Sequence, residues 1–172
     1  NYDVKILDAV AQDPVLKTVN GAKSHFGMDW RKIEREIRRY KPDVIGISCL
    51  FSAQSKNAHE VARIAKEVDD DIVNVMGGAH PSALPKQVLA DKNIDFVVIG
   101  EGGMTVLELI EALHTGNGFS NIAGIAYKNE ERIIINNPRQ LIQNLDEIPF
   151  PARHLLPMDK YFQAKAWHSA VI

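Results

Sequence analysis

Small, hydroxyl-bearing and glycine residues gather where three apolar runs end, and such residues suit holding a ligand better than making or breaking bonds. The three groups are Ser48-Cys49-Leu50, Gly77-Gly78-Ala79-His80 and Gly100-Glu101-Gly102-Gly103, and six of the eleven glycines, counting Gly46, lie in or beside them. Glycine lets a backbone approach a ligand closely or adopt positive φ. The plainer interpretation is that each glycine serves only its own turn. If the three groups share one edge of a fold, they form a crevice of backbone amides and small side chains.

Side chains equipped for catalysis are sparse at these positions. Asp8 and Glu101 are the carboxylates at the ends of expected strands, but no spacing in the sequence sets their separation. His80 is the one histidine among the three groups and is a candidate ligand contact. Cys49, inside an apolar run, is expected to be a small core residue. The sequence contains no GxxxxGK[ST], complete GxGxxG or GxSxG motif, so it favours a module whose ligand brings its own chemistry.

The elements that must position these groups alternate between strands and helices. We expect strands over residues 2–8, 44–51, 72–76 and 94–99, and helices over residues 30–40, 55–68, 84–90 and 105–114. Asp29 is expected to cap the first of these helices, and Thr105 with Glu108 to form a capping box on the last. The continuous apolar run over 44–51 is typical of a parallel strand covered on both faces. The pattern predicts an α/β fold with a doubly wound parallel sheet, which binds ligands beyond the carboxyl ends of its strands.

The pattern changes near Phe119. Residues 124–128 and 132–136 predict a β-hairpin, and four prolines follow within residues 138–157. We therefore expect an α/β domain over 1–118, a hairpin appendage over 119–136 and a linker over 137–172, with Trp167–Ile172 opening a further strand. Because the first residue is not methionine and residues 2–8 already resemble a strand, we expect a fragment that lacks its first βα unit.

Composition narrows the range of partners. The 172 residues carry 20 Lys and Arg against 22 Asp and Glu, a net charge of −2. This balance argues against a nucleic-acid-binding surface or an anionic-membrane patch. One cysteine permits no intrachain disulfide and no CxxC site. Without a membrane-length apolar run or a signal peptide, the expected location is cytoplasmic.

Several blocks resemble a known family. Ser48-Cys49-Leu50 followed by Gly77-Gly78 resembles the SxL…GG half of the cobalamin-binding fold, which is Rossmann-like and flavodoxin-like. The blocks VMGGAHP (75–81), FVVIGEG (96–102), IAGIAY (122–127) and PFPAR (149–153) occur in the order seen in the N-terminal region of cobalamin-dependent radical SAM enzymes. Among these, the chain resembles in particular the anaerobic magnesium-protoporphyrin IX monomethyl ester cyclase group.

The resemblance implies a cobalamin site at the carboxyl rim of the sheet, where the nucleotide tail of the cofactor enters. Its residues would be Ser48, Leu50, Gly77, Gly78, His80, Gly100, Glu101 and Gly102. It also implies a partner, the radical SAM domain of the same polypeptide, which would hold S-adenosylmethionine and a [4Fe–4S] cluster. The parent would be an oxidative cyclase or a methyltransferase, while this fragment alone would not be catalytic.

The chain departs from the family pattern in three places. Gly103 stands where the family usually has glutamate, and neither the DxHxxG motif of the cobalt ligand nor a CxxxCxxC cluster motif is present. Two other functions remain open from the residues. One is a flavodoxin- or receiver-like interaction module, although Ser48 and Gly100 stand at rim positions where a receiver would need other residues. The other is a degenerate domain that no longer binds a cofactor.

Overall fold

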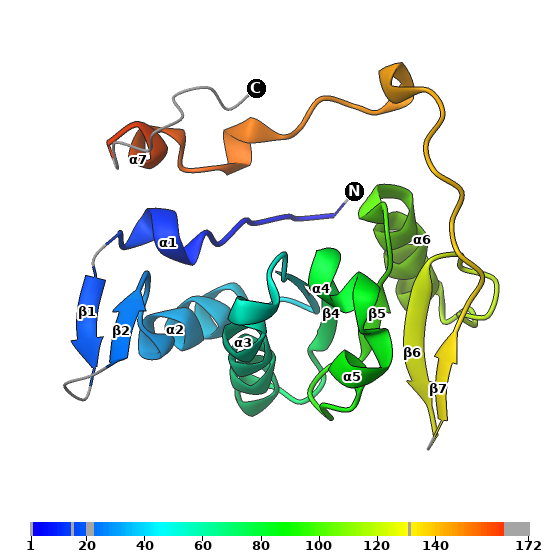
Figure 1. Ribbon diagram of the computed structural model, residues 1–172, viewed down its shortest axis with the longest axis horizontal. Helices are drawn as coiled ribbons and strands as arrows, with labels where there is room; N and C mark the ends of the chain where they lie inside the picture. Colours follow the sequence, from blue (N-terminus) through cyan, green and yellow to red (C-terminus); the bar gives the residue numbers. More distant parts are fainter. Residues whose placement is uncertain (1, 15, 20–22, 131, 164–172) are drawn as a thin grey trace. The chain divides into compact units, whose positions relative to one another are not determined.

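The structure, a computed structural model, describes residues 2–14, 16–19, 23–130 and 132–163. The chain divides into two compact units, one formed by residues 37–143 and the other by residues 1–36 together with 144–172. The first is called here the sheet unit and the second the terminal unit (Figure 1).

The sheet unit is built on five strands in the order β3-β4-β5-β6-β7. Strands β3 (Val44–Ser48), β4 (Val73–Gly77) and β5 (Phe96–Val98) are parallel, as the alternating pattern predicts. Strands β6 (Ile125–Asn129) and β7 (Arg132–Ile135) form the expected hairpin. However, β6 pairs antiparallel with β5, so the hairpin extends the sheet (Figure 1). The expectation of a wholly parallel sheet is therefore wrong for its last two strands.

The loop before β6 explains this change of direction. Phe119 and Ile122 pack into the core on one face of the sheet, where the Phe119 ring lies 4.8 Å from that of Phe96. The backbone N–H of Ile99 then donates to Gly124 O at 2.8 Å, beside the carboxyl end of β5. The chain thus returns along the sheet before β6 begins, and β6 can only run back.

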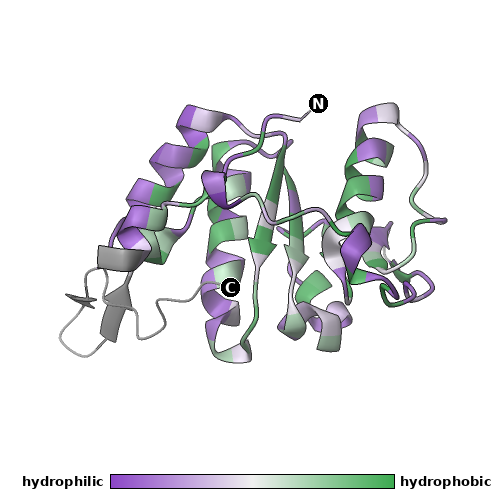
Figure 2. Ribbon diagram, turned by 90° about the horizontal axis from the view of Figure 1, so that it is seen from above, coloured by the Kyte–Doolittle hydropathy of each residue, from purple (hydrophilic) through white to green (hydrophobic). Residues whose placement is uncertain are grey.

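Two hydrophobic cores lie on opposite faces of this sheet, because successive strand residues point to alternate sides. Met76 and Val97 face α3 (Ser55–Val68) and α5 (Pro85–Leu89). Val75 and Val98 face α6 (Gly102–Thr115). Figure 2 shows the strands as largely hydrophobic and the helices as mixed, consistent with a sheet buried between helices.

The helices agree with the sequence except at two places. Asp29 caps α2 (Trp30–Tyr40), since its Oδ1 accepts from the Lys32 N–H at 3.0 Å. Helix α5 is the one expected over residues 84–90, but a further short helix, α4 (Ala79–Ala83), which the sequence does not predict, precedes it. Helix α6 ends close to the expected residue 114, with Gly116 at φ 71° as its C-cap, but it begins at Gly102. Thr105 and Glu108 are therefore not a capping box.

The strand β3 is less covered than its apolar sequence predicts. Within the described residues it forms an edge of the sheet, and Gly46 and Ser48 are exposed. Coverage on both faces is wrong here, because Ile47 is buried on one face while Gly46 and Ser48 are exposed on the other.

The terminal unit differs most from expectation. Residues 2–8 form no strand; instead Asp8 caps the short helix α1 (Ala9–Gln12), and its Oδ1 accepts from the N–H groups of Val10 and Ala11. Alternation predicts a strand only where a neighbour supplies backbone partners, and none pairs with this segment in the described chain. A hairpin of β1 (Leu16–Val19) and β2 (Lys23–Phe26) occupies a region expected to be loop.

The C-terminal segment is largely irregular, as expected of a linker, with 3-10 turns at Leu145–Glu147 and Arg153–Leu155. A short helix, α7 (Met158–Gln163), follows. The further strand expected at Trp167–Ile172 lies outside the described residues, and the three-part division of the chain remains a prediction.

Candidate cofactor-binding rim

The three parallel strands end side by side and create a common rim. Ser48 lies opposite Gly77, and Gly77 lies opposite Val98. The pairing continues one step past β3, where the Cys49 N–H donates to Gly77 O at 2.8 Å. The groups singled out from the sequence therefore meet at one edge of the sheet, which is called the rim from here on.

A strip without large side chains runs along β3 and β4 up to this rim. Gly46 pairs with Val75, Ser48 with Gly77, and Gly77 with Val98. Because paired residues point to the same face, Gly46, Ser48 and Gly77 lie on the face of the sheet on which α6 covers β5. A Cβ on Gly46 would meet no atom within 4 Å, and one on Gly77 would meet only the Val98 Cβ at 3.8 Å. Gly46, Ser48 and Gly77 are called the bare strip below. The strip can receive an extended group that lies flat on the backbone.

Three of the remaining rim glycines are constrained by contacts or conformation within the protein itself. Gly78 has φ +113°, and a Cβ there would lie 2.6 Å from Cys49 O. Gly100 has φ +76°, and its N–H donates to Ser82 Oγ at 3.0 Å. A Cβ on Gly102 would approach Val98 Cγ1 to 3.1 Å. Gly78 and Gly100 therefore shape the turns of the rim, whereas Gly77 leaves space above it.

The two polar side chains expected to touch a ligand have partners within the protein. His80 is 6% exposed, and its Nδ1 lies 2.9 Å from the Ser52 hydroxyl, so that it joins α4 to the turn after β3. Glu101 is exposed, and its Oε2 accepts from the Ile142 N–H at 2.8 Å. Both belong to the rim, and each holds a neighbouring segment of the chain in place.

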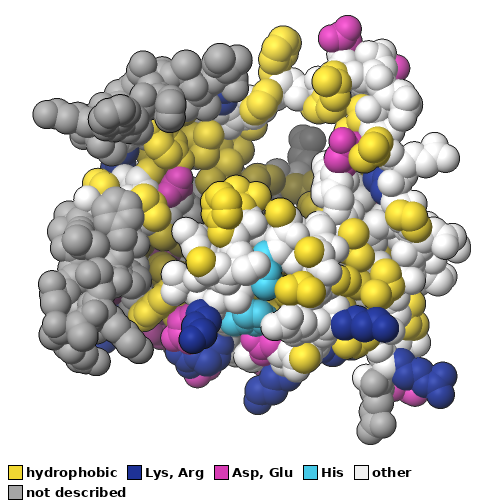
Figure 3. Space-filling view, in the orientation of Figure 1, with side chains coloured by type: hydrophobic (Ala, Val, Ile, Leu, Met, Phe, Trp, Pro, Cys, Tyr) yellow, Lys and Arg dark blue, Asp and Glu magenta, His cyan; other side chains and the backbone are white. Residues whose placement is uncertain are grey.

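Apolar side chains stand exposed beside the strip. Leu50 is 60% exposed, Phe51 67% and Met104, in the first turn of α6, 51%. On the face drawn in Figure 3, hydrophobic side chains gather over the upper part of the sheet unit, while most charged side chains over α3 and α5 lie at its lower end. Leu50 and Phe51, which follow β3 directly along the chain, give the rim an exposed apolar surface that could contribute to binding.

The rim has little catalytic equipment of its own. Cys49 is 1% exposed, and burial raises the pKa of its thiol, which suits the expected role of a core residue and not that of a nucleophile. Asp8 belongs to the terminal unit, where it caps α1 and accepts from the Tyr161 hydroxyl. That hydrogen bond raises the pKa of Tyr161 to about 12. Neither the Cys49 thiol nor the Asp8 carboxylate is therefore available for acid–base catalysis at the rim.

The described residues contain no group of three or more His, Cys, Asp or Glu arranged to hold a metal ion. In the same part of the chain no helix is both long and apolar enough to cross a membrane.

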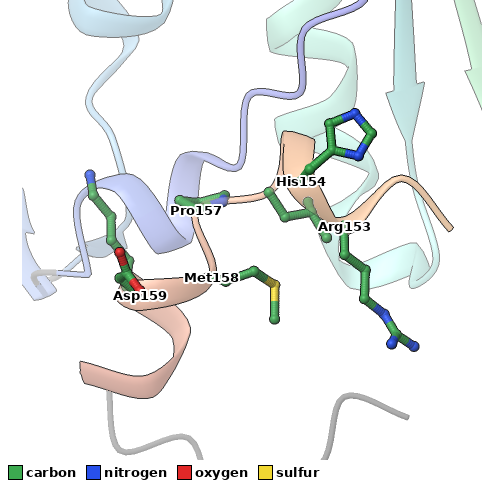
Figure 4. A pocket seen from close by; sticks show the side chains of 7 residues that line it. Arg153, His154, Pro157, Met158 and Asp159 are labelled. Carbon is green, nitrogen blue, oxygen red and sulfur yellow. The ribbon is translucent and has the colours of Figure 1, made fainter.

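A hollow of about 520 Å³ lies in the terminal unit and is lined by residues 153–154 and 156–160. Figure 4 shows the Arg153 and His154 side chains leaving the same turn in different directions. Because these two basic side chains do not point toward a common position, they do not form an anion-binding site in this hollow.

Gly46, which the sequence already places among the rim glycines, lies two residues before Ser48 and therefore on the same face of the strand. Ser82 and Arg139 escape sequence reasoning, because their partners, the Gly100 N–H and the Thr105 hydroxyl, are 18 and 34 residues away in sequence.

Strand order, rim and bare strip define an α/β ligand-binding domain, and comparison with known proteins gives its family. Residues 1–110 match the B12 binding domain. The chain belongs to this family and is related to B12-dependent radical SAM enzymes, both methyltransferases and magnesium-protoporphyrin cyclases.

Three curated proteins illustrate this relationship. The chain is 38% identical, over 93% of its length, to an uncharacterized methyltransferase of Pyrococcus horikoshii, of which it covers 32%. It is 34% identical, over 98% of its length, to the cytidylyl-2-hydroxyethylphosphonate methyltransferase of Streptomyces wedmorensis, of which it covers 36%. It is 34% identical, over 76% of its length, to the anaerobic magnesium-protoporphyrin IX monomethyl ester cyclase of Rubrivivax gelatinosus and covers 24% of it. The chain thus spans about a third of the length of the first two relatives.

Two solved structures share the fold. The cobalamin-dependent S-adenosylmethionine radical enzyme OxsB, with aqua-cobalamin and S-adenosylmethionine bound, superposes with a TM-score of 0.56 at 24% identity. That match covers 64% of this chain and 16% of OxsB. The radical S-adenosylmethionine methyltransferase TsrM of Kitasatospora setae, with cobalamin and a [4Fe–4S] cluster bound, gives 0.57 at 19% identity over 70% of this chain and 23% of TsrM.

The residues at the rim fit the cofactor of this family. The bare strip is a cradle that added Cβ atoms would narrow, and the exposed Leu50 and Phe51 offer apolar surface beside it. Cobalamin is bulky and partly apolar, and it needs both features.

Proposed function

We propose that this chain binds cobalamin, with the nucleotide tail of the cofactor lying along the bare strip. The observation that carries this proposal is the open space above Gly46 and Gly77, which continues to the exposed hydroxyl of Ser48. In a sheet otherwise covered by side chains, such a strip has no structural purpose of its own, because glycine weakens a strand interior.

Each rim residue has a defined part in this proposal. Ser48 offers a hydroxyl to the polar tail, and Leu50 covers its apolar portion. Gly77 leaves room for the tail, while Gly78 and Gly100 adopt the positive φ angles that the turns of the rim require. Gly102 packs α6 closely on Val98. His80 and Glu101 border the pocket and fix the loops around it.

The chain's own residues bind and orient the cofactor and shield its tail from water. When bound, cobalamin supplies methyl-transfer or radical chemistry, which the small and apolar groups of the rim cannot supply. We further propose that the parent is a cytoplasmic B12-dependent radical SAM enzyme of the methyltransferase or cyclase type. Its radical SAM domain would hold S-adenosylmethionine and a [4Fe–4S] cluster, and this chain alone would not be catalytic.

Titration with hydroxocobalamin, followed by desalting and visible absorbance, tests the proposal. The Gly77→Leu variant should lose the retained corrinoid, because the leucine side chain fills the strip. The variant should still fold, because a Cβ at this position makes only an ordinary van der Waals contact. The matched control is Gly118→Leu, at a glycine in the loop after α6 where no atom lies within 4 Å of an added Cβ. Circular dichroism and thermal unfolding establish that both variants fold.

The outcomes separate the candidate functions. Corrinoid retained by the wild type and Gly118→Leu but lost by Gly77→Leu supports a tail on the strip. Equal retention by all three places the cofactor elsewhere. No retention by the folded wild-type chain favours the degenerate domain for this fragment, and the longer parent then becomes the protein to titrate.

A further inference from the structure

The chain that leaves the sheet after β7 is tied back to the rim. Residues 138–143, called the strap here, begin three residues after the end of β7 and belong to the sheet unit. Two side chains anchor the strap, one near each of its ends.

Arg139 makes the first anchor, on α6. Its Nε donates to the Thr105 hydroxyl at 2.6 Å, and its guanidinium pairs with the Glu108 carboxylate. Thr105 is fully buried and in turn donates to Ala123 O at 3.2 Å. A Cβ on Gly124 would lie 3.3 Å from the Arg139 Cβ, so the strap packs closely against the start of β6. Thr105 and Glu108, which resemble a capping box in the sequence, are the receptor for this arginine.

Glu101 makes the second anchor, in the rim itself. Its carboxylate accepts the Ile142 N–H at 2.8 Å. Glu101 stands between Gly100, whose φ is +76°, and Gly102, the first residue of α6. A movement of this loop moves the acceptor, and a movement of the strap pulls on the loop.

We propose that the strap and the Gly100–Gly103 loop of the rim are coupled, with Arg139 and Glu101 as positioning residues. The loop and the strap then change conformation together. The consequence for cobalamin rests on the proposed function: occupancy of the rim and the conformation of the strap affect each other. By thermodynamic reciprocity, a released strap weakens binding at the rim as much as binding tightens the strap.

Amide hydrogen exchange on the full 172-residue chain without ligand tests the coupling directly. The Arg139→Met variant should raise exchange at Ile142 by about tenfold or more, because a hydrogen-bonded charge contributes about 1.5–3 kcal/mol. It should also raise exchange at Gly100, whose N–H is held by Ser82. The matched control, Arg132→Met, removes the same charge from the other end of β7 and should change neither amide.

Glu101 provides a second variant at the other anchor. Glu101→Ala should release Ile142, while Glu101→Gln, which keeps an acceptor oxygen, should restore much of the protection. If Ile142 exchanges faster in Arg139→Met while Gly100 is unchanged, the strap is only a tether and the coupling is wrong. Unchanged Ile142 exchange in both Arg139→Met and Glu101→Ala would show that neither anchor holds the strap.

The cofactor arm is read separately. With saturating hydroxocobalamin, Ile142 exchange should slow, and Arg139→Met should lower corrinoid affinity by the same factor. Corrinoid that binds without slowing Ile142 refutes the coupling while leaving the proposed function intact. Failure of corrinoid to bind refutes the proposed function for this chain, and the ligand-free experiment still decides the coupling.

Discussion

The two ends of the parallel strands in the sheet unit are built from opposite kinds of residue. The rim at the carboxyl ends is made of glycines, small residues and exposed apolar side chains. The amino ends carry a dense network of charged and amide groups, including His59–Asp91 at 2.6 Å and Lys66–Asp95 at 3.1 Å.

Asn74 stands at the centre of the amino-end network. It is fully buried, and its Nδ2 donates to Ala62 O at 3.0 Å and Asn93 O at 2.9 Å. Its backbone N–H donates to the Asp95 carboxylate at 2.7 Å. One side chain thus connects β4, α3 and the loop before β5. Lys128 of β6 extends the network by donating to Asp91 O at 2.6 Å.

The difference indicates that the two ends of the sheet have different roles. Hydrogen bonds that join elements stabilise the amino end, where no ligand has to enter. The rim leaves backbone and apolar surface open, which lowers stability but permits close approach by a cofactor. Substitutions at the two ends should therefore change different properties, stability at one and corrinoid binding at the other.

The largest expected effect falls on Gly78, a rim glycine that the fold itself requires. Gly78→Ala should lower the free energy of unfolding by about 3 kcal/mol, because it adds strain at positive φ to a 2.6 Å approach to Cys49 O. Urea denaturation measures the loss. The control is Gly103→Ala, where no atom lies within 4 Å and no positive φ is required, and stability should not fall. Equal stability of the two variants would contradict a structural role for Gly78.

Asn74→Ala tests the amino end. It leaves the buried carbonyls of Ala62 and Asn93 without this donor, and the free energy of unfolding should fall by about 2–3 kcal/mol. Corrinoid bound per folded molecule should stay unchanged, which absorbance and denaturation measured on the same sample can show. Asn57→Ala, at an exposed position of α3, is the control and should cost little. Loss of corrinoid by folded Asn74→Ala would mean that the two ends are not independent.

Gly46→Val tests the bare strip away from the strand end. The added side chain should weaken hydroxocobalamin binding by about tenfold through overpacking of the tail. Stability should stay the same or rise, since valine suits a strand better than glycine does. Equilibrium titration beside thermal unfolding measures both quantities. Unchanged affinity would show that the tail does not reach Gly46.

The smallest effect is expected at the surface of the amino-end network. Burial alone would raise the pKa of Asp91, but hydrogen bonds from Asn93 and His59 outweigh it and hold that pKa below its usual value. A carboxyl with a lowered folded pKa stabilises the protein above the unfolded pKa of about 4, and this contribution is lost as the pH falls through the folded pKa.

The Asp91→Asn substitution keeps an acceptor for Asn93 and removes the charge. It should cost about 1 kcal/mol at pH 7. Denaturation at several pH values should show the difference from wild type shrinking below about pH 4. A constant difference down to pH 2 would show that the charge of Asp91 is not what stabilises this corner.

Much of this architecture follows from local patterns. The apolar runs and glycine turns predict β3, β4 and β5, which the structure confirms. The helical spacing of Ala58, Val61, Ala62, Ala65 and Val68 predicts the inward face of α3. The three alanines are buried, whereas the two valines are only partly buried. The rim follows as well, because parallel strands joined by helices must end at one edge. These features depend on residues close in sequence or on a general rule of chain connection.

Partnerships between distant residues could not be predicted. Thr105 and Glu108 have the spacing of a capping box, yet Arg139, more than thirty positions away, uses both. The alternation over residues 2–8 predicts a strand, but without a neighbouring strand among the described residues Asp8 caps a helix instead.

The sequence by itself determined the α/β class, the parallel core of the sheet and the edge at which a ligand would bind. Only the tertiary structure decided which glycines are open and which are structural, that β6 runs antiparallel, and that Glu101 holds the strap. The physical reason is the separation along the chain over which each kind of interaction acts. Periodicity and turn chemistry act over a few residues, whereas the space above a glycine and the partner of a carboxylate depend on segments that meet only in the folded chain.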